Sequence, residues 1–122
     1  MRSASRAPSQ LRWLRASIGA TVRLIDVLDV DYLRAEDKYT RVAWRVAGSG
    51  PSRDAILRMP LKDLLPQLDE ARFAQVHRGI VVNLKVIDHV TRTGPESAEI
   101  HLAGRAEVLP VSRSYLHLFR QM

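Results

Sequence analysis

The stretch FAQVHRGIVVN, residues 73–83, decides how the rest of the chain can be arranged. Apolar and polar side chains alternate up to His77, after which the basic Arg78 stands beside Gly79. A continuous β-branched run follows at 80–82, and Asn83 closes it. Such a run is typical of a buried strand, whereas a glycine after a basic pair is typical of a turn that presents a cation. The stretch therefore predicts a packed strand that joins the core to a basic edge.

The overall composition is that of a globular protein, and it excludes several classes of function. The 122 residues, of which 46 % are apolar and 26 % charged, predict one domain at 11–122. Residues 1–10 are basic and serine-containing, which predicts a disordered leader or the remnant of a linker. The chain has no cysteine, which excludes disulfides and thiolate metal sites and fits a cytoplasmic protein. The longest apolar runs have three residues, so we expect no membrane span.

The net charge of +6 and the pI near 10.5 favour a polyanionic partner. Of the 19 basic residues only three are lysine, so 16 are arginine. Arginine suits bidentate contacts to phosphate and guanine. A coding sequence of high GC content is the alternative explanation, because it enriches arginine throughout a protein.

Hydrophobic periodicity predicts many short strands, bounded by turn residues at intervals of about ten residues. Besides 73–83, the expected strands are 11–18, 21–24, 31–36, 40–46, 53–59, 86–92, 98–102 and 107–111. A turn of helix or a tight bend is expected at 26–30, and GSGP at 48–51 predicts a hairpin. This pattern is typical of a mostly β protein whose strands are mainly antiparallel.

Two short helices complete the expected elements. The first begins at Pro60, and its apolar stripe at 61, 64, 65 and 68 should kink or end early because Pro66 removes a backbone donor. The second follows Ser112, a plausible N-cap, with an apolar stripe at 115, 118, 119 and 122.

Four segments in this order resemble the LytTR DNA-binding domain, the output module of the LytR/AlgR class of bacterial response regulators. They are AEDKYTRV (35–42), LRMPLKDLLPQL (57–68), FAQVHRGIVVNLKVI (73–87) and LPVSRSYLHLF (109–119). The resemblance covers residues 11–122. It implies about ten short strands in small packed antiparallel sheets, with two or three short helices at the sides. It also implies that loops and strand ends on one edge enter the major groove of DNA, commonly with two copies on a direct repeat.

The resemblance also implies which side chains face DNA. Thr40 replaces a histidine that some members carry, and the receiver domain of complete regulators has no counterpart in this sequence. The DNA-facing residues implied by the family motifs are Lys38, Thr40, Arg41, His77, Arg78 and Arg113.

Several of these residues have a structural alternative. Arg113 could be an ordinary surface arginine or pair with Glu107, and Arg78 could pair with an acidic residue on a neighbouring loop. For His77, a phosphate contact and a structural imidazole are equally compatible with the sequence. We expect Tyr39 to fold onto the core and Asn83 to bond backbone at a turn.

Enzymatic motifs are missing from the sequence. It contains no H-x-x-x-H, G-x-S-x-G or phosphate-loop pattern, so we predict no enzyme, no metal site and no cofactor. The leading hypothesis is a sequence-specific double-stranded DNA-binding regulator of transcription, with a possible dimer on DNA. The alternative is a protein-interaction module on the same scaffold, which docks a receiver domain, a sensor protein or another partner.

Overall fold

The structure, a computed structural model, describes residues 11–46 and 50–120, and ten strands lie within these ranges. The strands are β1 (Trp13–Ile18), β2 (Thr21–Asp26), β3 (Val30–Glu36), β4 (Tyr39–Trp44), β5 (Arg53–Leu57), β6 (Phe73–His77), β7 (Ile80–Asn83), β8 (Ile87–Gly94), β9 (Ser97–Leu102) and β10 (Val108–Val111). The helical segments are α1 (Leu61–Leu64) and the 3-10 turns η1 (Val27–Asp29), η3 (Leu65–Gln67), η4 (Leu84–Val86) and η5 (Arg113–Phe119). The expected mostly β fold is confirmed.

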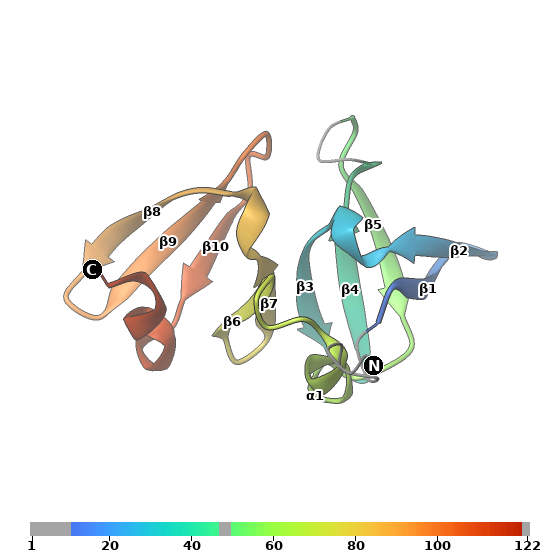
Figure 1. Cartoon of the computed structure of the whole chain (residues 1–122), viewed down its shortest axis with the longest axis horizontal. Helices are drawn as coiled ribbons and strands as arrows, with labels where there is room; N and C mark the ends of the chain where they lie inside the picture. Colours follow the sequence, from blue (N-terminus) through green and yellow to red (C-terminus); the bar gives the residue numbers. More distant parts are fainter. Residues whose placement is uncertain (1–10, 47–49, 121–122) are drawn as a thin grey trace, which may run out of the picture.

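The strands form two antiparallel sheets, which lie side by side in Figure 1 with β6 and β7 between them. The large sheet has seven strands in the order β2-β1-β5-β4-β3-β7-β6, and the small sheet has three in the order β10-β9-β8. Neighbouring strands in the chain pair as hairpins in most places, which explains why so many short connections suffice.

Alternation along the strands of the large sheet creates two cores, one on each face. One face carries Leu33, Val42 and Val81 and packs against Leu61 and Leu64 of α1. The other face packs against the small sheet. Its cluster comprises Tyr32, Ala43, Val76, Ile80 and Val82 from the large sheet and Ala98, Ile100, Leu102, Leu109 and Val111 from the small sheet.

Residues 73–83 form the hairpin β6–β7 at the centre of this arrangement. Phe73 pairs with Asn83 across the hairpin, and Arg78-Gly79 forms its turn. The run at 80–82 is buried, as the sequence predicts. Asn83 is fully buried; its Nδ2 donates to the Val30 carbonyl at 2.9 Å, and its Oδ1 accepts from the Lys85 amide at 2.9 Å. The expected backbone role of Asn83 is therefore confirmed.

The first helix ends earlier than its leucine stripe predicts. α1 has only four residues, and the chain continues as the 3-10 turn η3, which contains Pro66. A proline has no amide hydrogen to extend an α-helix, so the chain tightens instead. Leu68 lies beyond the helix but still packs in the core with Leu61 and Leu64.

The C-terminal segment is a 3-10 helix, so the expected α-helical stripe is wrong in part. In a 3-10 helix every third side chain lies on the same face, whereas in an α-helix the side chains on one face are spaced by three or four residues. Leu116 and Phe119 pack against the small-sheet core together with Tyr115, whereas Leu118 is 44 % exposed. Ser112 precedes this helix but makes no side-chain capping bond. Position 122 lies outside the described residues.

Strand boundaries differ slightly from the expected ones. β1 begins at Trp13 rather than at 11, β4 ends at Trp44 rather than at 46, and β5 ends at Leu57 rather than at 59. β4 and β5 pair antiparallel as expected, although residues 47–49 of their connection lie outside the described residues, as do residues 1–10. Within the described ranges, no helix is long and apolar enough to cross a membrane.

Candidate nucleic-acid interface

Three connections that the sequence singles out lie together along one end of the two sheets, the lower rim in Figure 1. The Ala35 amide donates to the Gly79 carbonyl at 2.8 Å, which sets the β3–β4 turn beside the β6–β7 turn. The Ser112 amide donates to the Val76 carbonyl at 3.0 Å, which sets the start of η5 beside the end of β6. We call this region, formed by residues 37–38, 78–79 and 113, the basic edge.

Lys38 occupies the β3–β4 turn, between the paired residues Glu36 and Tyr39. Asp37 has a φ of 55°, in the left-handed region that aspartate tolerates better than most residues. Lys38 is exposed and makes no ion pair with the described residues. Tyr39 is 44 % exposed, so the expectation that it folds onto the core is wrong.

Arg41 projects beside this turn, but its charge is already matched. Its Nε and Nη2 donate to the two carboxylate oxygens of Glu36 at 2.6 and 2.9 Å, and Asp54 lies 3.6 Å from Nη1. These hydrogen bonds lower the pKa of the Glu36 carboxyl below its usual value. A phosphate would have to compete with two carboxylates for this guanidinium, so Arg41 is a weaker candidate than Lys38.

Thr40 does not face solvent, and the prediction that it contacts DNA is corrected by its burial. Its exposed fraction is 0 %, and its Oγ1 donates to the Met59 carbonyl at 2.7 Å. Thr40 pairs with Leu57 of β5, on the face of the sheet that carries Val42. Its hydroxyl therefore ties the end of β5 to β4.

Arg78 is exposed at the tip of the β6–β7 hairpin, and local hydrogen bonds shape the turn beneath it. The Gly79 amide donates to Nδ1 of His77 at 3.1 Å, and Nε2 of Gln75 donates to the Arg78 carbonyl at 3.2 Å. Because Nδ1 accepts a bond, neutral His77 carries its proton on Nε2. His77 is half-buried and has a structural role in the turn through Nδ1.

Arg113 is exposed, with 76 % of its side chain accessible. Its Nη1 contacts a carboxylate oxygen of Glu96, in the β8–β9 turn, at 2.9 Å. The expected alternative partner, Glu107, is engaged elsewhere. An exposed pair of this kind contributes only about 0–1 kcal/mol, so a phosphate can displace Glu96 at small cost.

Residues 20–122 match the family model of the LytTr DNA-binding domain. The chain belongs to this family. The resemblance that the four sequence segments carry is thereby confirmed, and the fold agrees with it.

Two known proteins are similar to this LytTr domain. An uncharacterized response regulatory protein of Vibrio cholerae serotype O1 is 43 % identical over 113 residues, which are 93 % of this chain and 42 % of that protein. The chain thus spans less than half the length of this curated relative. The solved LytTr DNA-binding domain of a methyl-accepting/DNA response regulator from Bacillus cereus shares the fold, with a TM-score of 0.78 and 22 % identity over 90 % of this chain and 94 % of that one.

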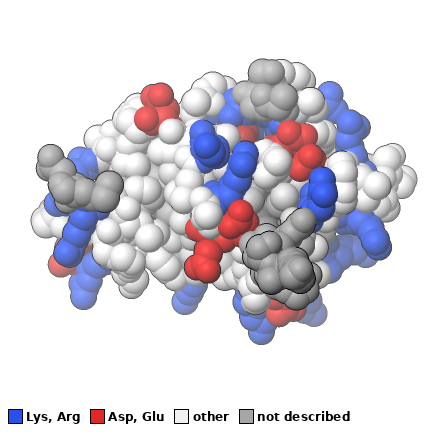
Figure 2. All heavy atoms as spheres, viewed as in Figure 1, with Lys and Arg blue, Asp and Glu red and all other residues white. Residues whose placement is uncertain are grey.

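Sequence reasoning missed two further cations at the end of the LytTr domain that carries the basic edge. Arg58 is exposed and directly follows β5, whose last residue pairs with Thr40. Lys62 is exposed on α1. The pairing register of β4 with β5 puts Arg58 at the same end of the sheet as the basic edge. This register cannot be read from the sequence alone. Figure 2 shows Lys and Arg side chains projecting along this lower rim.

Sequence reasoning also missed an ionic cluster between the two sheets, buried except for the half-exposed Glu107. Asp31 of β3 is 1 % exposed, and its Oδ2 accepts from Nε of Arg45 at 2.6 Å and from Nε of Arg105 at 2.7 Å. Nη1 of Arg105 contacts Glu107 at 2.6 Å. We call Asp31, Arg45, Arg105 and Glu107 the inter-sheet clamp.

Tyr32 extends the inter-sheet clamp into the small-sheet core. Its hydroxyl donates to Oε2 of Glu107 at 2.6 Å. Burial, followed by this bond to a carboxylate, raises the pKa of the Tyr32 hydroxyl to about 12. The bond from Tyr32 and the Arg105 guanidinium lower the pKa of Glu107 below its usual value.

Metal ligands do not converge anywhere in residues 11–46 and 50–120, where no group of three or more candidate side chains could hold an ion. His89 and His101 stack across β8 and β9, with ring centroids 4.3 Å apart and planes 10° from parallel. Stacked imidazoles do not direct their nitrogens at a common ion, so this pair reads as a surface packing contact.

Proposed function

We propose that this LytTr domain binds double-stranded DNA with sequence specificity and regulates transcription, reading the major groove through the loops and strand ends of the basic edge. The observation that carries the proposal is the convergence of Lys38, Arg78 and Arg113, exposed side chains from three separate connections, on one edge of a LytTr domain. Cations from three connections can meet a curved phosphate backbone and an adjoining groove at the same time.

Arg78 has the geometry of a base reader. It stands at the tip of a two-stranded hairpin, and the major groove, about 12 Å wide, admits a two-stranded ribbon. Its planar guanidinium can donate two bonds to O6 and N7 of guanine, the commonest specific contact in such complexes. His77, on the same hairpin, would donate from Nε2 to a neighbouring phosphate.

Arg113 and Lys38 flank this hairpin tip. Arg113 would exchange its contact with Glu96 for a guanine or a phosphate, and Lys38 would serve as a point charge for phosphate. Arg41 would contribute to the field of the edge rather than to a direct bond, because Glu36 holds its guanidinium.

The wider setting of the domain is a further part of the proposal. We infer that two copies occupy a direct repeat in a promoter, with dimer contacts formed on DNA. The curated relative is named a response regulatory protein, and this chain spans 42 % of it. We therefore also infer that a receiver domain or sensor protein controls this DNA-binding domain, and that it works in the bacterial cytoplasm.

Selection from a randomised DNA pool, followed by titration at several salt concentrations, tests the proposal. We expect a repeated motif to be enriched and to bind about 10³-fold or more tightly than its scrambled version. The logarithm of affinity should fall linearly with the logarithm of salt, with a slope of roughly −3 to −5 for a handful of phosphate contacts. Equal affinity for enriched and scrambled DNA would refute sequence-specific reading.

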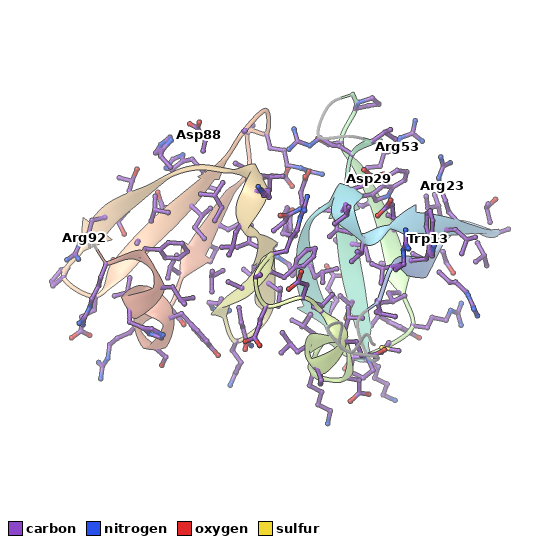
Figure 3. The ribbon with its side chains drawn as sticks, in the orientation of Figure 1. Trp13, Arg23, Asp29, Arg53, Asp88 and Arg92 are labelled. Atoms are coloured by element: carbon purple, nitrogen blue, oxygen red, sulfur yellow. The ribbon has the colours of Figure 1, made fainter. Side chains whose placement is uncertain are left out.

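A second candidate, a protein-interaction module, is favoured by an exposed apolar face on β1 and β2. Trp13, Val22 and Leu24 are 51 %, 66 % and 62 % exposed, and the pairing register puts them on one face. Figure 3 shows Trp13 at the end of the molecule remote from the small sheet. A tight complex with a receiver domain, combined with equal affinity for all DNA sequences, would favour this second function.

A further inference from the structure

The inter-sheet clamp lies at the opposite end of the sheets from the basic edge. Val30 pairs with Trp44 at the clamp end of β3 and β4, whereas Glu36 pairs with Tyr39 at the basic edge. The seven residues of β3 separate the two ends by about 20 Å, at roughly 3.3 Å a residue. The clamp residues are thus too far from the edge to touch DNA bound there.

Two members of the clamp join the two sheets: Glu107 accepts the Tyr32 hydroxyl of β3 at 2.6 Å, and Arg105 makes the larger number of bonds. Arg105 stands in the connection between β9 and β10, and 2 % of its side chain is exposed. Its guanidinium contacts Asp31 of β3 at 2.7 Å, Glu107 at 2.6 Å and the Trp44 carbonyl, at the end of β4, at 3.5 Å. One side chain of the small sheet's connection therefore holds two strands of the large sheet.

Neighbouring groups restrict the Arg105 side chain to this position. Its guanidinium lies over the Tyr32 ring, 5.6 Å from the centroid. Gly104 has a φ of 76°, and a Cβ at this position would come within 2.6 Å of Nη1 of Arg45. Only glycine adopts this backbone conformation freely and leaves room for Arg45, so the connection is fitted to the ionic contacts.

The two sheets each carry a different part of the basic edge. Arg78 belongs to a hairpin of the large sheet, whereas Arg113 directly follows β10 of the small sheet. Near the edge, the described parts of the two sheets are joined by the backbone bond from Ser112 to Val76 and by apolar packing. Apolar packing is non-directional, whereas the charge-assisted bonds of the clamp require one geometry.

We propose that Arg105 is a positioning residue, which fixes the angle between the two sheets and so sets the spacing of Arg78 and Arg113 for DNA recognition. The proposal rests on the proposed DNA-binding function. It predicts that loosening the clamp impairs discrimination between DNA sequences, while electrostatic attraction to any DNA persists, since the exposed charges are unchanged.

Arg105→Lys is the test variant, because it keeps the charge but lacks the planar fork that bonds Asp31 and Glu107 together. Arg53→Lys is the matched control; Arg53 is exposed at the start of β5, away from the basic edge (Figure 3). For Arg105→Lys we expect the ratio of specific to scrambled affinity to fall about fivefold or more, the lower end of the effect of one mismatched base pair. Affinity for scrambled DNA and its salt slope should stay unchanged, and Arg53→Lys should keep the full ratio.

A distance measurement without DNA separates positioning from folding. The chain has no cysteine, so spin labels can be attached to Val22→Cys on β2 and Thr91→Cys on β8, both exposed. We expect Arg105→Lys to broaden the distribution of distances between the labels, and Arg53→Lys to leave it unchanged. An unbroadened distribution, or an unchanged specificity ratio in folded Arg105→Lys, would overturn the proposal.

Glu107→Gln keeps the inference testable if Arg105→Lys fails to fold. It leaves Arg45 and Arg105 on Asp31, but a glutamine has only one accepting oxygen, so it cannot keep both bonds that Glu107 accepts, from Arg105 and from Tyr32. A smaller loss of the specificity ratio is expected, and no loss would contradict the positioning role. If the wild-type protein itself shows no sequence preference, the proposed function fails, and the distance measurement still decides whether Arg105 fixes the sheets.

Discussion

The Ala35 amide donates a hydrogen bond to the Gly79 carbonyl at 2.8 Å, so the turns at 37–38 and 78–79, which are far apart in sequence, stand side by side. A Cβ at Gly79 would lie 3.6 Å from the Ala35 Cβ, an ordinary van der Waals contact, so the close approach of the two turns does not depend on glycine. The bond aligns Lys38 and Arg78 along one edge. The following predictions test what that edge and its supports do.

Replacement of Arg78 by alanine should weaken binding to the selected site by about 1–3 kcal/mol and relax base preference at one position. The side chain is exposed, so the free energy of unfolding should change by less than about 0.5 kcal/mol. Competition assays with single-base variants of the site would measure both effects. Arg53→Ala, a remote exposed arginine, is the control, and an equal loss there would assign the effect to net charge.

Glu96→Gln should strengthen DNA binding, because it removes the carboxylate that holds Arg113 at 2.9 Å. The gain should be modest, within about 1 kcal/mol, as for other exposed ion pairs. Arg113→Ala should instead lose about 1–3 kcal/mol and relax one base position. If the Arg113 variant unfolds, the arginine is structural and both expectations fail.

Thr40→Val should lower the free energy of unfolding by about 1–3 kcal/mol, because it leaves the partly buried Met59 carbonyl without its 2.7 Å hydrogen bond. Affinity for DNA should not change in the folded variant. Chemical denaturation and DNA titration of the same preparation separate the two outcomes. A selective loss of DNA affinity would restore Thr40 as a contact residue.

The stability of the fold should depend on pH at both extremes. The folded-state pKa of Glu107 lies below its usual value, so its contribution is present above about pH 4.5 and is lost as pH falls through the folded pKa. The pKa of Tyr32 is raised from 10.0 to about 12, so its contribution is present below pH 10 and is lost between pH 10 and 12. Denaturation curves should show the alkaline loss, on the order of 2 kcal/mol, and Tyr32→Phe should abolish it. An identical alkaline loss in Tyr32→Phe would contradict this assignment.

Leu116→Ala and Leu118→Ala should differ, because η5 is a 3-10 helix. Leu116 packs against the small-sheet core, and its truncation should cost roughly 1–2 kcal/mol, less than the 2–5 kcal/mol of a fully buried leucine. Leu118 is 44 % exposed and should cost less than about 0.5 kcal/mol. Thermal unfolding of both variants measures the difference. Equal losses of unfolding free energy would argue that this segment is an α-helix.

The sequence predicts those features that depend on local pattern. The buried run at 80–82, the backbone role of Asn83 and the early end of α1 at Pro66 each follow from residues close together in the chain. Thr40 shares the parity of Val42 and Trp44, so alternation alone places it on their buried face. The family motif implied that Thr40 faces DNA, whereas the burial of Thr40 agrees with the alternation.

Features that depend on distant pairings could not be predicted. Arg105 meets Asp31 across 74 residues, and Arg113 meets Glu96 across 17. Neither pairing leaves a periodic signal, because the first depends on how the two sheets pack and the second on how the strands of the small sheet are aligned. The exposure of Tyr39 was missed for a related reason, since a hairpin of unknown register does not show which face a residue takes.

The outer edge of β2 has a consequence for the behaviour of the domain at high concentration. β2 pairs with β1 without a bulge and ends the large sheet, so its outer edge has no neighbouring strand among residues 11–46 and 50–120. Natural proteins usually protect such edges with lysine, proline or a bulge, whereas here Arg23 alone interrupts Val22 and Leu24. Self-association of the concentrated domain should therefore begin at β2, and Leu24→Lys should improve its solubility without touching the basic edge.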